Sequence, residues 1–385
     1  MESFLIDNRQ MEEIMKAKDT GAIIALLYQM DYRQDLEEFG GTGIKEELID
    51  FALSRNLARR IGKLVDISPT TDRKLMRSIV GKWDLANIKL AIEAKGRKAS
   101  YDSISRYVID EGQYNKQVIK ESMSEESVET LIAKLMINSP YTAILRSAAE
   151  EYKKKRRTID AVNAIDMGYY SVLGSAVTKL RTVHPQSSRM LKISIDVRNL
   201  MLLIKAKRAG MKFTEIEPLI AEHGTVAKEE LSKMYEGSKD LESFVESIKI
   251  ADMQNALDIY KKSRNKELLP FEIALRNAML KDSVRLLGHS VLSFGSILAY
   301  LYFKEIEVDT LRVMIHGSMY GLSNEEKERQ VCRLYAFSGT YSRSILIHLY
   351  YCTVLSQLYD LSYEPVLSYL HHVIHAASKH ILCNY

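Results

Sequence analysis

The sequence contains few residues that cross-link a chain or interrupt helices. Only three of its 385 residues are cysteines, Cys332, Cys352 and Cys383, and all lie near the C-terminus. A disulfide framework is therefore excluded before residue 332, as is typical of a reducing compartment. Six prolines and eighteen glycines favour long helices over many short strands joined by turns.

Long hydrophobic runs are also rare. The longest stretch without a charged side chain runs from Leu286 to Phe303, and glycines, serines and a histidine interrupt it. We expect a buried helix pair there rather than a membrane-spanning helix. The first residues show no basic segment followed by an apolar one, so no signal peptide is predicted.

The charge balance is too even to imply nucleic acid as an obligatory partner, and we expect none. The 54 basic and 50 acidic residues give a formal net charge of only +4. Hydrophobic residues make up 46% and charged residues 27%, which is typical of a folded protein rather than a disordered one.

Motifs of nucleotide and metal chemistry are missing. Gly81-Lys82 lacks both the upstream glycine and the following hydroxyl of a phosphate-binding loop. His371, His372 and His375 could place two imidazoles on one helix face, but no third ligand stands at a matching spacing. We expect no catalytic residue, no cofactor and no metal.

One segment occurs three times, beginning at Asp84, Asp196 and Glu307, so its period is 112 and then 111 residues. Its signature positions are Asp84, Asn87 and Lys95, then Asp196, Asn199 and Lys207, then Glu307 and Thr310. Apolar residues follow each acid at the spacing of one helix stripe. The acid therefore reads as a helix N-cap, and we expect all three acids at equivalent helix starts.

The repeat extends beyond this helix. Gly112 and Gly224 each stand 17 residues after the signature lysine, whereas Tyr32 and Tyr141 recur at an offset of 109. We therefore predict an all-α protein of three helical units, stacked or closed into a pseudo-threefold funnel. Their predicted ranges are 1–112, 113–224 and 225–335.

Residues 336–385 form an atypical tail rich in tyrosine, histidine and cysteine. Its uncharged run from Ser344 to Tyr359 is too short to span a bilayer. We expect the tail to be loosely docked, poorly ordered or in contact with a membrane, and dispensable for folding.

Two basic clusters precede the same helix in the second and third units. They comprise Lys153, Lys154, Lys155, Arg156 and Arg157, and Lys261, Lys262, Arg264 and Lys266. The plainer interpretation is a solvated helix end. The alternative is an interaction surface for anionic lipid headgroups, an acidic partner or nucleic acid.

The repeated helix, acidic-x-x-Asn and ending in lysine, resembles the C subunit of archaeal-type rotary ATPases and its relative, the d subunit of vacuolar ATPases. The most specific stretch runs from Ile195 to Gly210, and the segment from Tyr302 to Leu322 is similar to the end of that family. The resemblance covers residues 1 to roughly 335. Family members usually carry an additional first helix before the stretch that matches Met1–Leu5.

The resemblance implies a non-catalytic coupling protein on the cytoplasmic side of the membrane. Family members are funnels that sit on the ring of membrane rotor subunits and receive the central shaft, made of the D and F subunits. Such a protein transmits torque for ATP synthesis or ion pumping. The alternatives are a helical-repeat scaffold that binds other proteins or RNA through the basic clusters, and an unrecognised enzyme.

Overall fold

The computed structural model describes residues 5–68, 70–110, 112–250, 252–264, 266–287 and 294–332. Every regular element in these ranges is a helix, which confirms the all-α prediction. The predicted tail lies outside the described residues, as does the centre of the long uncharged run. The described ends of that run belong to α17 and α18.

The helices follow one another through short connections. The first group is α1 (Asn8–Met15), α2 (Thr20–Tyr28), α3 (Arg33–Glu37), η1 (Gly41–Gly43), α4 (Glu46–Ile67) and α5 (Thr70–Val80). The second is α6 (Lys82–Gly96), α7 (Tyr101–Ile104), η2 (Ser105–Tyr107), α8 (Lys116–Met123), α9 (Val128–Leu135), α10 (Thr142–Lys155) and α11 (Thr158–Val183). The third is α12 (Pro185–Arg208), α13 (Phe213–Ile216), η3 (Glu217–Leu219), α14 (Lys228–Glu236), α15 (Leu241–Ser247) and α16 (Met253–Lys262). The last is α17 (Leu269–Leu287), α18 (Phe294–Met319) and α19 (Asn324–Glu328).

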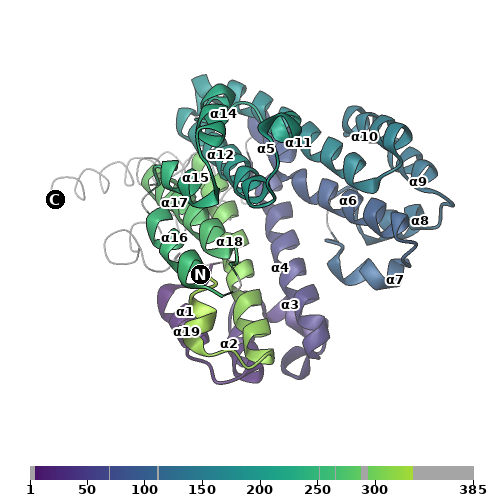
Figure 1. Ribbon diagram of the computed structural model, residues 1–385. Helices are drawn as coiled ribbons and strands as arrows, with labels where there is room; N and C mark the ends of the chain where they lie inside the picture. The colour runs from purple at the N-terminus through teal and green to yellow at the C-terminus, as the bar shows by residue number, and fades with distance from the viewer. Residues whose placement is uncertain are drawn as a thin grey trace, which may run out of the picture.

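Buried apolar side chains form three clusters. One joins α1–α5 to α18 and to the adjoining halves of α11 and α12. A second fills the space between the C-terminal half of α12 and α13–α17. The third lies among α6–α10 and the first turns of α11, and these helices form the arm on the right of Figure 1. The long helices α11 and α12 each contribute to two clusters. They therefore connect the three groups of helices built around these clusters, which we call the three bodies.

The repeated apolar stripe is a core face, as predicted. The equivalent residues Ile88, Leu200 and Leu311 are at most 5% exposed, and the next equivalent set, Ile92, Ile204 and Ile315, is at most 1% exposed. Burying such side chains is the main favourable contribution to folding.

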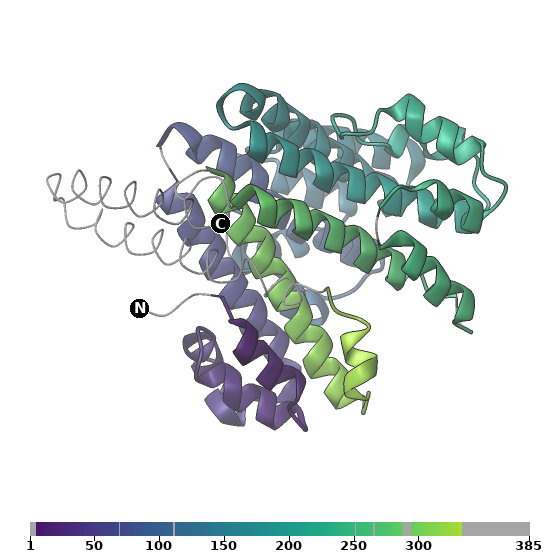
Figure 2. The ribbon, with the colours of Figure 1, turned by 90° about the vertical axis from the view of Figure 1, so that its left-hand side faces the viewer.

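The first residues of α5 and α18 meet the turn between α11 and α12. His184, between α11 and α12, places its Nε2 3.5 Å from the Asp72 carboxylate at the start of α5. The same imidazole stacks on Phe294, the first residue of α18, with ring centroids 5.6 Å apart. Figure 2 shows the same region from the side, where α18 runs down beside the N-terminal helices.

The predicted unit boundaries remain predictions. The apolar clusters pair segments across them, because the cluster of α6–α10 continues into α11 beyond residue 112. The N-terminal helices likewise share a cluster with α18.

Candidate functional site

The signature acids do not stand at equivalent helix starts. Asp84 is the third residue of α6, but Asp196 and Glu307 lie in the middle of α12 and α18. None caps its own helix, so the N-cap interpretation was wrong. In the first copy a break at Gly81 separates α5 from α6, whereas α12 and α18 run continuously through the corresponding position.

Each acid instead accepts backbone N–H groups from the segment that leads into another helix. Asp84 Oδ1 accepts from Tyr114 at 3.1 Å, directly before the N-cap of α8. Asp196 accepts from Thr225 at 2.9 Å and from Val226 at 3.3 Å, just before α14. These N–H groups have no hydrogen-bond partner within a helix, and the carboxylate accepts from them. Its negative charge also interacts favourably with the partial positive charge of the helix N-terminus.

The third acid makes the same contact with the beginning of the chain. Glu307 Oε2 accepts from the Ile6 N–H at 2.6 Å, directly before the N-cap of α1. The paired tyrosines also correspond, since Tyr141 donates its hydroxyl to Asp84 at 2.9 Å and Tyr32 donates to Glu307 at 2.7 Å. The N-terminal helices thus occupy, beside α18, the place that α8 and α9 occupy beside α6.

The signature asparagines hold the connecting loops by their backbone. Asn87 both donates to the Ile109 carbonyl at 2.7 Å and accepts from the Ile109 N–H at 3.0 Å. Asn199 makes the same pair of bonds with Ala221, at 2.8 and 2.9 Å. In the third copy Thr310 is buried on α18. A side-chain amide can pair with a peptide group in this way because it carries one donor and one acceptor side by side.

The signature lysines bind the other end of the same short helices. Lys95 Nζ donates to the Met123 carbonyl at the end of α8, at 2.9 Å. Lys207 Nζ donates to the carbonyls of Tyr235 and Ser238 at the end of α14, at 2.7 Å each. Acid and lysine, eleven residues apart, therefore hold a short helix at both termini with charges that suit its dipole.

The repeated glycines leave room for the acids. A Cβ at Gly112 would overlap the Asp84 carboxylate, and a Cβ at Gly224 would overlap that of Asp196. Gly112 also has φ of +80°, a conformation that favours glycine. Packing against the carboxylate therefore explains why glycine recurs at this spacing.

Burial dominates the titration of these acids. It raises the pKa of both Asp84 and Asp196, although the hydrogen bonds to each carboxylate act in the opposite direction. The two carboxylates therefore bind protons at a higher pH in the folded protein than in the unfolded chain.

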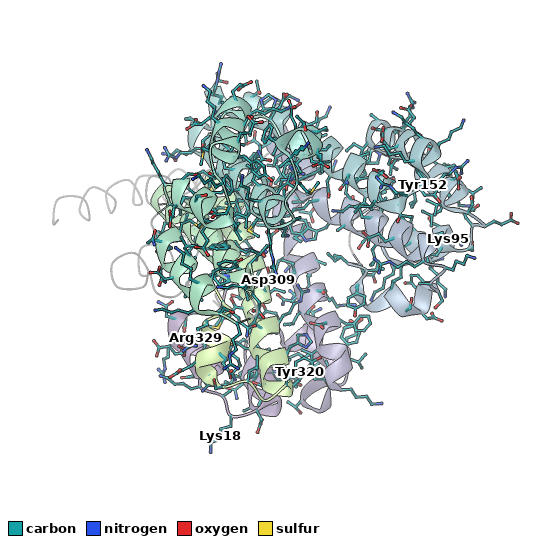
Figure 3. All side chains as sticks on the ribbon, viewed as in Figure 1. Lys18, Lys95, Tyr152, Asp309, Tyr320 and Arg329 are labelled. Atoms are coloured by element: carbon teal, nitrogen blue, oxygen red, sulfur yellow. The ribbon has the colours of Figure 1, made fainter. Side chains whose placement is uncertain are left out.

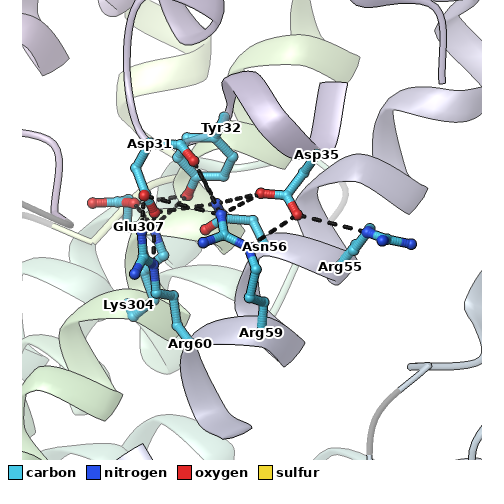
Figure 4. A network of polar contacts seen from close by, with 9 residues as sticks. All are labelled: Asp31, Tyr32, Asp35, Arg55, Asn56, Arg59, Arg60, Lys304 and Glu307. Atoms are coloured by element: carbon cyan, nitrogen blue, oxygen red, sulfur yellow. Dashed lines mark hydrogen bonds and ion pairs between the residues drawn. The ribbon is translucent and has the colours of Figure 1, made fainter. Parts of the chain in front are cut away.

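Where α18 meets the N-terminal helices, the polar side chains form a buried network (Figure 4). At its centre Lys304 Nζ lies 2.7 Å from Glu307 Oε1 and 3.8 Å from Asp31, and both Lys304 and Glu307 are at most 1% exposed. The ammonium also lies 4.3 Å from the centroid of the Tyr32 ring. Burial lowers the pKa of Lys304, and the carboxylate of Glu307 opposes that shift.

Helix α4 completes the network. Arg60 Nε donates to Asp31 at 2.8 Å, and Arg59 donates to the fully buried Asp35 at 2.6 Å. Asn56 donates to the same Asp35 oxygen, Oδ2, at 2.8 Å. Buried charges persist only when they are paired and hydrogen-bonded, so this network fixes the relative positions of α3, α4 and α18.

The basic cluster at 153–157 is largely neutralised within the chain. Lys155 lies 2.7 Å from Glu151 and 3.3 Å from Asp160, and Arg157 lies 2.6 Å from Asp160. These contacts lower the pKa of Asp160. Arg156 pairs with Glu129, so only Lys153 and Lys154 have no ion pair within the part of the chain that the structure describes.

The cluster at 261–266 lies on a different body. Lys261 is 3.4 Å from Glu242 and 3.3 Å from Glu246, and Lys266 donates to the Lys261 carbonyl at 2.8 Å. Lys262 and Arg264 make no ion pair with any described residue. Figure 3 shows Tyr152, which precedes the first cluster, in the arm of α6–α10, far from α16 on the opposite side of Figure 1. The two basic clusters therefore do not form one continuous surface.

In the described ranges no three side chains of histidine, cysteine, aspartate or glutamate are grouped to hold a metal ion. No described helix combines the length and apolar composition needed to cross a bilayer. Apart from Glu307, which belongs to the repeat signature, the residues of the buried network are those that sequence reasoning missed. The only signal for them was the pairing of Tyr32 with Tyr141, which marks equivalent positions but not their partner.

The sequence is similar to a known family over most of its length. The family described as "ATP synthase (C/AC39) subunit" matches residues 1–330. A relative from Haloquadratum walsbyi, named as the C subunit of an A-type ATP synthase, is 26% identical over 332 residues, which cover 86% of this chain and 94% of the relative.

Two further relatives bear the same name. One from Methanococcoides burtonii is 26% identical over 79% of this chain and 83% of its own length. One from Methanocaldococcus jannaschii is 25% identical over 84% of this chain and 82% of its own length. With an all-helical fold and a family match over residues 1–330, the chain belongs to the ATP synthase (C/AC39) subunit family.

Proposed function

We propose that this chain is the non-catalytic socket of a rotary A/V-type ATPase, between the membrane rotor ring and the central shaft of the D and F subunits. It would act at the cytoplasmic face of the membrane without crossing it. The family match carries this proposal, because the relatives are named as subunits of A-type ATP synthases.

The connections around α18 support a mechanical role. Lys82 on α6 lies 2.5 Å from Glu305, and Arg276 on α17 lies 2.9 Å from Asp309. The buried network around Glu307 adds a third connection, to the N-terminal helices. Contacts that join three parts of the protein to one helix restrict the motion of those parts relative to one another. Torque transmission requires such stiffness.

The exposed cations Lys153, Lys154, Lys262 and Arg264 remain a proposed interaction surface for acidic groups of the ring or the membrane. They lie on two separate bodies, so each pair would act alone. Few unpaired cations remain in either cluster, which gives the RNA-scaffold alternative little electrostatic support.

Affinity purification of the tagged chain from native membranes tests the proposal. We expect recovery of the ring subunits and of the D and F subunits, and no salt-sensitive recovery of RNA. Recovery of RNA without any rotary ATPase component would replace the socket by the scaffold. The purified chain should also hydrolyse no ATP.

A further inference from the structure

One stretch of the sequence contains basic residues but no acidic ones. From residue 167 to residue 195 the sequence contains no aspartate and no glutamate. The same stretch contains Lys179, Arg181, Arg189 and Lys192. These four cations lie on the C-terminal part of α11 and the N-terminal part of α12, on either side of the corner between the two helices.

The corner contains an open cleft of about 400 Å³. We call it the cationic cleft; among the residues that line it are Arg181, Arg189, Lys192, Pro185, Ile193 and Thr225. The cations come from α11 and α12, and Thr225 lies in the loop that precedes α14. No carboxylate lines the cleft.

Two of the cations that line the cleft have no carboxylate partner among the described residues. Neither Arg181 nor Lys192 makes an ion pair with any carboxylate in the described ranges. The nearby acid, Asp196, is buried and directs its oxygens at the N–H groups of Thr225 and Val226. The basic cluster at 153–157 differs, because carboxylates of the chain pair with most of its cations.

We propose that the cationic cleft binds an acidic segment of a partner protein. The recessed shape favours a polypeptide over a bilayer, because a planar surface cannot follow a concave wall. Pro185 and Ile193 provide apolar contact between the cations, which suits an extended chain whose carboxylates alternate with small residues. This inference identifies a binding surface and its ligand chemistry, and it holds whether or not the socket proposal is correct.

A labelled twelve-residue peptide of alternating glutamate and alanine is the probe, and its glutamine counterpart is the control peptide. By fluorescence anisotropy at low ionic strength, the glutamate peptide should bind and the glutamine peptide should not. The variant Arg181→Glu/Lys192→Glu should weaken binding at least about fivefold, since each exposed charge contributes modestly. Binding should also fall as salt is raised.

The matched control is Lys18→Glu/Lys120→Glu, which reverses two exposed cations outside the cleft and outside both basic clusters and should leave binding within about twofold. The milder variant Arg181→Gln/Lys192→Gln covers the case in which the charge reversal impairs folding. Equal binding by the cleft variants and the unaltered chain would overturn the proposal. Sedimentation with vesicles containing phosphatidylserine, if lost in the cleft variants while peptide binding is absent, would assign the cleft to membranes instead.

Discussion

At the scale of single residues, the signature carboxylates determine which neighbours are possible. Asp84 and Asp196 each accept backbone N–H groups from a loop, and glycine is required where that loop passes the carboxylate. Gly210 provides a comparison, because its φ of +69° is also positive but a Cβ there would meet no atom within 4 Å.

We therefore expect Gly112→Ala to cost more stability than Gly210→Ala. The control should lose about 1 kcal/mol for the left-handed backbone alone. Gly112→Ala should lose about 2–3 kcal/mol in denaturant unfolding, because the new methyl group also crowds Asp84. Adding Asp84→Ala should remove the extra cost, and equal losses in the two glycine variants would contradict the packing explanation.

The pH dependence of stability tests the burial of the same acids. A raised pKa means that the folded protein binds a proton at Asp84 and Asp196 at a higher pH than the unfolded chain does. Their contribution to stability is then fully present below the unfolded pKa, about 3.9, and is lost as pH rises through the folded pKa. The Tm of the unaltered protein minus the Tm of Asp84→Asn/Asp196→Asn should therefore be more positive at about pH 4 than at about pH 7. A difference that grows with pH would show that hydrogen bonding outweighs burial.

At the scale of elements, the acid and lysine of each signature act as a pair on one short helix. Replacing Lys207 by Met removes the donor to two carbonyls at the end of α14. Hydrogen exchange of the α14 amides should accelerate by the equivalent of about 1–3 kcal/mol, since charged hydrogen bonds contribute that much. The control Lys205→Met changes an exposed side chain on α12, the helix that carries Lys207, and should leave hydrogen exchange in α14 unaffected. Comparable effects of the two variants would refute a specific role of Lys207 at the end of α14.

Much of this element-level organisation could be predicted from the sequence. The spacing of Leu200 and Ile204 marks a buried helix face, and the structure buries both. The function of Asp196 was not predictable, because helical periodicity shows which face a residue occupies but not which loop crosses that face. The neutralisation of Arg156 by Glu129 was hidden for the same reason, since the pair is 27 residues apart and meets only in the fold.

At the scale of the whole molecule, the chain is closed by contacts between its first helices and α18. The Glu307→Gln substitution would leave Lys304 buried beside a neutral amide, with the Asp31 carboxylate 3.8 Å away. Breaking a buried pair in this way typically costs about 3–5 kcal/mol, which denaturant unfolding would detect. The control Asp309→Asn alters a half-exposed carboxylate on the same helix and should cost about 1 kcal/mol or less. A similar cost for both would mean that the network does not fasten the N-terminal helices.

In the proposed function, this chain couples rotation of the membrane ring to ATP turnover. The most direct measurement is ATP-driven ion uptake by membrane vesicles prepared with and without the chain, alongside ATP hydrolysis by the soluble head. Without the chain, hydrolysis should continue and ion uptake should disappear, and adding the purified protein back should restore uptake. Ion uptake that persists at its full rate in vesicles without the chain would contradict the account.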